Sequence, residues 1–473
     1  MRIFKPNRGA ALLALAAAGV TAAAQAAPAP PAPPPPPPPN FGSPAPRFNS
    51  GDNAFEFKVR GRVQMDLVNV SSSYNQRAFT AGNTGLSVIN EEFTRSASRR
   101  VRLGVDGRMN SKFRYRVEFE SNRGAIAWTD LIMEYIGKDY SVVLGNQKGI
   151  AALDEVTSDP VNLFNERAAY QNAFALGDRR LGVLFKKGGP NWTFDAGLYG
   201  DSINNAETSA RTNGLGVAEG TNATEAYAAG VRATFAPIFS VTPEGARILH
   251  LGMLYRYRNQ GDDALLSYTA RPGISNYAAQ TINTSLSTTN PLAANSGFQA
   301  DETWNFEAAY IHGPVGVVAE YAEVSARRPN STTIVNPAAA REFSFSGGYV
   351  DAFWQITGEN RIVRQGEIRR MVPRKSIVEG GPGLWQVGAR YEVLDLKDGT
   401  GNCFGTGVTV GSRAICGGVY NTVGAVVNWQ PVEFIKVTGQ YATTSVRGGI
   451  NTSATNRRDG TVDVWQTRVQ FDF

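Results

Sequence analysis

The chain ends in Trp465-Gln466-Thr467-Arg468-Val469-Gln470-Phe471-Asp472-Phe473, in which large apolar side chains alternate with polar ones. Successive side chains of a β-strand point to opposite faces, so this segment presents one face suited to lipid and one suited to water. Segments of about ten residues with the same alternation recur from Phe55 onward, separated by turn residues. The pattern predicts an all-β protein, a sixteen-stranded antiparallel transmembrane β-barrel.

The expected strands are even in number, as bacterial single-chain barrels require. They cover residues 55–69, 98–108, 113–121, 127–136, 140–148, 179–187, 191–200, 224–236, 247–258, 302–311, 315–325, 347–357, 384–394, 420–429, 433–443 and 462–473. A soluble β-sandwich also alternates, but it has no systematic lipid face with aromatic ends.

The connections between these strands alternate in length, as expected for short periplasmic turns and long outer loops. The tight turns are Gly137-Lys138-Asp139, Gly188-Gly189-Pro190, His312-Gly313-Pro314 and Gln430-Pro431. The long connections are 70–97, 149–178, 201–223, 259–301, 326–346, 395–419 and 444–461. The segment 358–383 is an exception, because it is long and falls on the short side.

The segment before the barrel divides into two parts. Residues 1–26 have a basic start, an apolar stretch too short to span a membrane comfortably, and Ala24-Gln25-Ala26 at the end, which predicts a cleaved signal peptide. Residues 27–54 are a Pro-rich linker, in which Pro28 to Pro39 should form a stiff polyproline II rod. The barrel is expected to occupy residues 55–473.

Composition excludes several classes of protein. No run of eighteen apolar residues follows residue 21, which argues against a helical transporter. The two histidines, His250 and His312, and the two cysteines, Cys403 and Cys416, cannot supply a zinc cluster or an iron–sulfur centre. No metal or cofactor is expected, and a catalytic role for either histidine is not favoured.

With the apolar face outward, the charged face lines the lumen. The inward positions are rich in arginine, whose guanidinium group binds oxyanions through two parallel hydrogen bonds. They include Lys58, Arg60, Arg62, Gln64, Asp66, Arg100, Arg102, Arg114, Arg116, Glu118, Glu120, Arg232, Arg256 and Arg258. Alternatively, these arginines simply solvate the wall and pair with Glu118, Glu120, Asp130, Glu134 and Asp195.

The long connection 149–178 is expected to fold inward and form a constriction. It is acidic, with Arg167 as its single cation and Lys148 at its edge. Its acidic residues are Asp154, Glu155, Asp159, Glu166 and Asp178. Anion preference would therefore have to come from the arginines of the wall.

Several short segments, in this order, resemble the phosphate-selective porins of the O and P type over roughly residues 55–473. They are Val59-Arg60-Gly61-Arg62 with Asp66, Arg99 through Val105, Asn165 through Tyr170, Arg180 through Val183, Ile356 through Arg361, and Asn421 through Trp429 with Pro431. The resemblance implies a trimeric outer-membrane channel in which basic residues near the constriction and an arginine ladder handle phosphate.

Carried over residue by residue, the resemblance implies a basic site at Arg99 and Arg100, ladder positions at Arg232 and Arg258, and a pairing aspartate at Asp130. Strict alternation puts Arg99 outward, so it joins the site only if the strand bulges or ends there. Pro160 stands where the phosphate-binding members carry a key lysine, which should weaken discrimination of phosphate from other anions.

The leading hypothesis is an outer-membrane porin, and not an enzyme, that passes small anions, with phosphate or polyphosphate first. The alternative is a porin for other solutes without phosphate specificity. Expected partners are these anions, outer-membrane lipid, two further copies in a homotrimer and the insertion machinery; nucleic acid is not expected. The cell outer membrane of a Gram-negative bacterium is the expected location.

Two expectations concern single positions. Cys403 and Cys416 lie in one long Gly-rich loop of an exported protein and are expected to form a disulfide. Phe473 is expected to serve as the assembly signal, since a C-terminal aromatic has this role in proteins of this resemblance.

Overall fold

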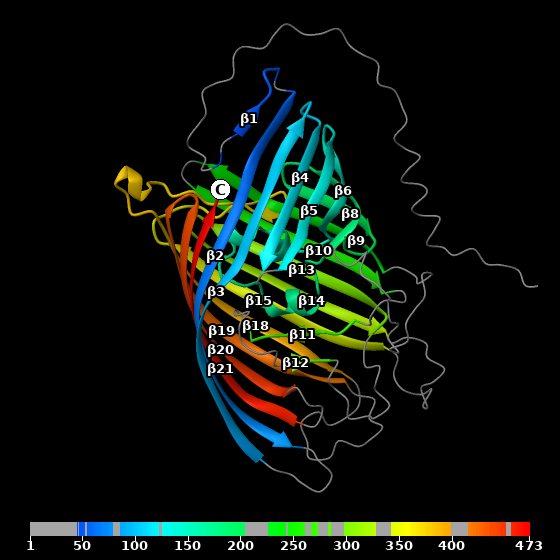
Figure 1. The fold of residues 1–473 in the computed structure, drawn as a ribbon, viewed down its shortest axis with the longest axis vertical. Coiled ribbons are helices and arrows are strands. Elements are labelled where there is room, and N and C mark those ends of the chain that lie inside the picture. Colours follow the sequence, from blue (N-terminus) through cyan, green and yellow to red (C-terminus); the bar gives the residue numbers. More distant parts are fainter. Residues whose placement is uncertain are drawn as a thin grey trace, which may run out of the picture.

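The computed structural model describes residues 45, 47–52, 54–78, 86–122, 125–203, 226–242, 245–260, 266–272, 282–284, 298–327, 342–398, 415–450 and 456–473. Within these residues a single antiparallel sheet of seventeen strands closes on itself. Sixteen strands form the barrel wall, each paired with its neighbour in sequence, and the short strand β1 is added at one edge (Figure 1). The predicted sixteen-stranded antiparallel barrel is confirmed.

The wall strands are β2 (Phe55–Ala78), β3 (Leu86–Met109), β4 (Phe113–Asn122), β5 (Ala125–Ile136), β6 (Tyr140–Lys148), β7 (Arg179–Gly188), β8 (Trp192–Tyr199), β9 (Tyr227–Thr242), β10 (Gly245–Asn259), β13 (Ala300–His312), β14 (Val315–Arg327), β15 (Glu342–Gln355), β18 (Leu384–Asp398), β19 (Ile415–Val432), β20 (Ile435–Ile450) and β21 (Asn456–Asp472). The smaller elements are β1 (Arg47–Asn49), β11 (Thr269–Ala270), β12 (Ile282–Asn283), β16 (Val363–Arg364) and β17 (Glu367–Ile368), with helices α2 (Leu153–Val156), η1 (Asp159–Val161), α3 (Ala169–Ala173) and η2 (Ile377–Glu379).

The barrel closes where β21 pairs with β2, and the last residue takes part in the closure. Phe473 and Gly61 exchange two backbone hydrogen bonds of 3.0 and 2.9 Å. A Cβ atom on Gly61 would lie 2.2 Å from the ring of Phe473, so a glycine is required beneath this ring. Beyond this point β2 continues to Phe55, where β1 pairs with Glu56–Lys58 and covers the edge that β21 leaves free.

The outward face carries the apolar half of the alternation and is ringed by aromatic side chains at both ends. Trp385 and Trp429 stack with ring centroids 5.6 Å apart near the short-turn end. Near the long-loop end Tyr255 packs against Trp304 at 4.7 Å, and Tyr441 packs against Trp465 at 4.5 Å. Aromatic girdles of this kind mark the two membrane–water interfaces of a barrel.

Several strand ends differ from the predicted ones. β2 and β3 stay paired through much of the segment 70–97, which was expected to be a loop. The polar residues of this segment predicted a loop. Strands that extend beyond the membrane do not contact lipid, however, so their outward side chains can be polar. The turn expected at Gln430-Pro431 lies instead at Glu433-Phe434, because the ladder shifts register between Trp429 and Val432 and β19 continues through Pro431.

The connection from β6 to β7, residues 149–178, folds into the barrel as predicted and contains α2, η1 and α3. Its apolar side chains pack against inward residues of the wall; Tyr170 stacks on Tyr349 at 6.3 Å, and Phe174 lies 5.6 Å from Tyr268. Tyr268 belongs to the β10–β13 connection, so part of that loop also turns inward. One side of the barrel interior is thus a packed core.

The exceptional segment 358–383 also enters the barrel, which explains its length. Its hairpin β16–β17 turns at Gln365 and Gly366, which have φ angles of 53° and 69°. The hairpin buries Val363 and Ile368 in the interior core, and its Gly366 carbonyl accepts a hydrogen bond of 2.7 Å from Arg232. A second inward segment therefore meets the first from the opposite end.

Among the described residues, no helix is both long enough and apolar enough to cross a membrane. The expected signal peptide and most of the Pro-rich linker lie outside the described residues. Arg47–Asn49, at the end of the expected linker, are strand β1, so the sheet starts before Phe55.

Candidate functional site

The inward arginines fall into two groups that differ in exposure. The side chains of Arg232 and Arg258 are each 3% exposed, beneath the inward loop 149–178. By contrast, Arg60, Arg114 and Arg116 on β2 and β4 are 20–30% exposed. We call β9 to β21 the anchoring wall and β2 to β7 the open wall, in which Arg62 and Arg180 are the buried exceptions.

On the anchoring wall the arginines hold other parts of the protein. Arg232 binds Glu307 at 2.6 Å and the Gly366 carbonyl. Arg258 binds Asp301 at 2.5 Å. Arg256 donates to the carbonyls of Phe174 and Ala175 in the inward loop, each at 2.8 Å. These three predicted anion-site residues point inward as expected, but their guanidinium groups are engaged with protein.

Carboxylates of the same wall bind backbone N–H groups at the start of the loop helices. Glu307 accepts from Leu153 N at 2.9 Å, and Glu320 accepts from Asp154 N at 2.6 Å. No side chain of the loop itself caps α2, so these wall carboxylates satisfy its free donors. Glu320 also accepts from the hydroxyls of Tyr170 and Tyr349, each at 3.0 Å.

Cations of the anchoring wall bind the loop carbonyls in the same way. Arg390 donates to Glu166 O at 3.1 Å, pairs with Asp351 at 2.7 Å and lies over the ring of Phe164 at 4.7 Å. Arg468 donates to Asn165 O at 2.5 Å. The loop is therefore fixed to one side of the barrel by charged hydrogen bonds to its backbone.

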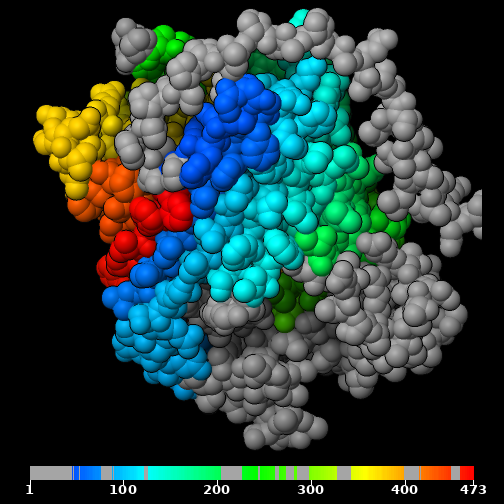
Figure 2. All heavy atoms as spheres, turned by 45° about the horizontal axis from the view of Figure 1, so that its top comes forward, coloured from blue at the N-terminus to red at the C-terminus, as the bar shows by residue number. Residues whose placement is uncertain are grey.

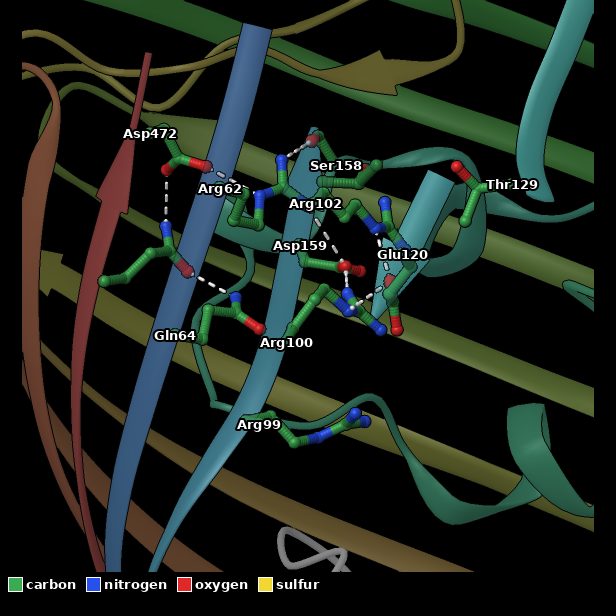
Figure 3. A network of polar contacts seen from close by, with 12 residues as sticks. Arg62, Gln64, Arg99, Arg100, Arg102, Glu120, Thr129, Ser158, Asp159 and Asp472 are labelled. Carbon is green, nitrogen blue, oxygen red and sulfur yellow. Dashed lines mark hydrogen bonds and ion pairs between the residues drawn. The ribbon is translucent and has the colours of Figure 1, made fainter. Parts of the chain in front are cut away.

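A connected series of ion pairs, which we call the charge ring, joins the loop to the open wall. Its loop arc begins at Arg100, which pairs with Asp159 of η1, as Figure 3 shows. Asp159 lies 2.5 Å from Arg167, and Arg167 lies 2.9 Å from Glu155. Glu155 in turn contacts Lys148 at 2.9 Å. Lys148 faces Arg179 across the β6–β7 ladder, but these two cations do not pair, so the series is open here and the wall arc begins at Arg179.

The wall arc returns along β2 to β7. Arg179 lies 2.8 Å from Asp130, which is 3.0 Å from Arg116, and Arg116 lies 2.7 Å from Asp106. From Asp106 the series runs through Arg60, Glu118, Arg102 and Glu120 to Arg100. Two further cations, Arg62 and Arg114, join it at Asp159 and Asp106 and bring in their other partners, Asp472 and Glu134, so nine basic groups meet eight carboxylates.

A β-bulge places Arg99 inside the barrel. Gln64 pairs with Arg100 while the next residue, Met65, pairs with Ser98, so Arg99 is the extra residue. Its guanidinium binds both oxygens of Glu166 at 2.9 Å. The double arginine Arg99-Arg100 therefore faces the lumen, which strict alternation does not allow (Figure 3).

Glu155, Asp159 and Glu166 of the loop are neutralised by pairing, and Asp154 by burial. Burial favours the neutral form of Glu166, but Arg99 and Arg468 outweigh it and hold its pKa below the usual range. Burial acts in the same sense on Glu155, where Arg167 and Lys148 lower the pKa. For Asp154 burial prevails over Arg390 and Arg167, and the pKa is raised. Apart from Asp178, whose side chain is 55% exposed and lies 4.0 Å from Arg258, the loop adds little unpaired negative charge.

Two cations that the sequence did not single out lie against Pro160 and its neighbours. Lys436 Nζ is 2.6 Å from Asn162 O and 3.5 Å from Pro160 O. Arg361 donates to Val161 O at 3.0 Å. Alternation in β20 predicts an inward Lys436, but its contact with the loop depends on how the loop packs.

A small pocket of about 10 Å³ lies between the loop and strands β7 to β10. It is lined by Arg180, Arg256, Asp178 and Tyr199 among others, and the buried Tyr199 hydroxyl has no hydrogen-bond partner in the described part of the chain. Arg180 and Arg256 thus add basic groups between the charge ring and the long-loop end of the barrel.

The family model described as phosphate-selective porin O and P matches residues 57–473. The chain belongs to this family. The match spans the whole barrel wall apart from the first residues of β2. Together with the closed barrel and its two aromatic girdles, it makes the chain a porin of the Gram-negative outer membrane, with the fold of a channel.

Two curated proteins are similar to this chain in sequence. An uncharacterized protein of Caulobacter vibrioides is 29% identical over 435 residues, covering 91% of this chain and 76% of that protein. Porin O of Pseudomonas aeruginosa is 22% identical over 250 residues, so that match spans about half of each chain, 50% and 52%.

Among solved structures, an anion-selective porin from Comamonas acidovorans has the same fold, with a TM-score of 0.50 and 10% identity. The match covers 89% of this chain and 100% of that porin. At this identity the likeness establishes the porin barrel and no more.

Proposed function

We propose that this porin passes small anions in preference to cations, with phosphate or polyphosphate as the leading solutes, and that it works as a homotrimer. The proposal rests on one observation, the partly exposed guanidinium groups of the open wall. Each arginine carries five N–H donors in a fixed fork. Arg114 and Arg116 bond carboxylates through all three nitrogens, and their exposure of 30% and 20% leaves the remaining donors open to an anion.

The pairing within the charge ring does not remove this preference. Basic groups outnumber carboxylates there by one; Arg100 belongs to the ring, and Arg99 pairs with Glu166 beside it. A ring of arginines around a confined aqueous passage favours anions, and binding there must stay weak enough for the ion to leave. The name of the Comamonas porin, anion-selective, agrees with this reading.

Discrimination of phosphate from chloride should be modest. Pro160 adds no charge at the tip of the loop, and the nearby Lys436 uses its ammonium group on loop carbonyls. A porin with broader specificity is the second candidate, and the carboxylates interleaved along the charge ring favour it. Phosphate block of chloride current separates the two.

The test replaces Arg60 and Arg116 by glutamine, singly and together, and measures ion preference in planar bilayers. We expect the anion preference to fall stepwise, because each change removes a partly exposed cation. Arg47→Gln is the matched control, since Arg47 lies on β1 outside the passage and pairs with Glu56. Unchanged selectivity in the double variant would show that the arginines of the open wall do not set the anion preference.

Phosphate binding has its own test in Pro160→Lys, compared with the uncharged Pro160→Met. The added ammonium group should strengthen phosphate block of the chloride current. Equal block in the two variants would show that position 160 does not face the route of the anion.

A further inference from the structure

The second half of the connection 358–383 leaves the barrel and forms an ordered projection, residues 374–383. In Figure 1 it is the gold helix that stands clear of the strands, and in Figure 2 it forms a gold lobe beyond the outline of the barrel. Its tip is η2, where Val378 is 82% exposed and Ile377 is 47% exposed. The channel described above uses none of these residues.

The projection is built to hold this shape. Ser376 and Glu379 form a capping box, in which the Glu379 carboxylate accepts from Ser376 N at 2.9 Å and also from the Ser376 hydroxyl at 2.6 Å. Gly380 ends η2 in the left-handed conformation at φ 73°, and Gly383 N bonds to Lys375 O at 3.1 Å. An element this well fixed presents its two β-branched apolar side chains to the outside as a defined surface.

The base of the projection lies at the aromatic girdle. The indole N–H groups of Trp385 and Trp429 both donate to the carbonyl of Pro382, at 3.2 and 3.0 Å. Stacked tryptophans of a girdle lie at the level of the lipid headgroups. The apolar tip therefore starts from the height at which the inner leaflet of the outer membrane meets the periplasm.

The charges beside the tip suit a phospholipid surface. Arg374 and Lys375 are exposed, and the single acidic residue of the projection, Glu379, is held by Ser376. Basic groups next to apolar side chains and tryptophan are the features of an interfacial anchor that binds anionic headgroups.

We propose that residues 374–383 are a lipid anchor, with Ile377 and Val378 inserted among the acyl chains of the periplasmic leaflet and Arg374 and Lys375 on phosphate headgroups. The anchor would fix the tilt and height of this side of the barrel. It is independent of which solute the channel passes.

The test introduces an indole by Val378→Trp and reconstitutes the full-length porin in phosphatidylethanolamine and phosphatidylglycerol vesicles with brominated acyl chains. Gly51→Trp is the control, because Gly51 lies in the exposed β1–β2 turn with open space around it. After subtraction of wild-type emission, we expect quenching at position 378 to be about twofold greater than at position 51. Equal quenching at both positions would overturn the proposal.

A second measurement separates lipid from a second copy of the chain. Val378→Cys in a Cys403→Ser, Cys416→Ser background is oxidised in vesicles and run without reductant. Monomeric bands are expected on denaturing gels. A cross-linked dimer through position 378 would assign the projection to contact between subunits and contradict the lipid anchor.

Discussion

Arg99 binds both carboxylate oxygens of Glu166, and it reaches them because β3 carries one extra residue at this point. Without the bulge the side chain of Arg99 would face lipid. With it, Arg99 faces the lumen and holds the inward loop at Glu166, a contact that we call the clamp. Glu166 also pairs with Arg468 of β21 at 2.8 Å. Two strands that are far apart in the sequence therefore hold the loop through one carboxylate.

This clamp should depend on pH. The pKa of Glu166 is held below its usual range in the folded protein, so the ion pairs stabilise the docked loop at every pH above the unfolded value of about 4.3. The contribution is lost as the pH falls through the lowered value. Open-channel noise, which reports loop movement, should therefore rise in acid and stay low at neutral pH.

Glu166→Gln should show the raised noise already at pH 7, with no further step in acid. The control is Glu433→Gln, which removes a carboxylate from an exposed turn. A quiet channel at pH 7 in Glu166→Gln would show that the carboxylate does not hold the loop.

The anchoring wall should respond to mutation differently from the open wall. Replacing Arg232 by alanine leaves Glu307 buried with His250 at 2.8 Å and releases the Gly366 carbonyl of the periplasmic hairpin. Removal of one partner from a buried ion pair costs about 3–5 kcal/mol. We expect lower thermal stability and greater protease sensitivity of both inward segments, measured on the purified porin. A variant with native stability and altered selectivity alone would assign Arg232 to the ion path.

Gly61 and Phe473 should be coupled in assembly. Gly61→Ala puts a methyl group into the ring of Phe473 and should cost roughly 1–3 kcal/mol through overpacking. It should also lower outer-membrane levels, as deletion of Phe473 should, because both displace the terminal aromatic that we propose the insertion machinery reads. Gly439→Ala is the control, since a Cβ at Gly439 meets nothing within 4 Å. Normal levels in Gly61→Ala would contradict this coupling.

The disulfide between Cys403 and Cys416 stays a prediction, because Cys403 and the side chain of Cys416 lie outside the described residues. In the chain-entropy model its closed loop contributes roughly 3 kcal/mol. Alkylation of the unreduced, denatured protein should detect no free thiol. Two alkylated cysteines per chain would rule the bond out.

Alternation along the chain was enough to predict the barrel, because the period of two is a local property of each strand. It also placed Arg60, Arg62, Arg100 and Arg102 inside the barrel. The same rule gave Arg99 the wrong face, since a bulge is set by the register between β2 and β3 and not by β3 alone.

The sequence could not predict which inward arginines bind the inward segments and which stay partly exposed. Arg258 and Arg116 look equivalent as inward residues of strands. They differ because the inward loop packs over one and leaves the other facing the passage, which depends on contacts between segments far apart in the chain. For the same reason Lys436 and Arg361 were not predicted to reach the loop carbonyls beside Pro160.

The most direct test of an anion-preferring channel is the reversal potential of the wild-type porin in a planar bilayer under a potassium chloride gradient. Because the arginines of the open wall are partly exposed, we expect a reversal potential with the sign of a chloride-selective channel. Added phosphate should reduce the size of this potential. A potential of the opposite sign, showing preference for potassium, would contradict the account.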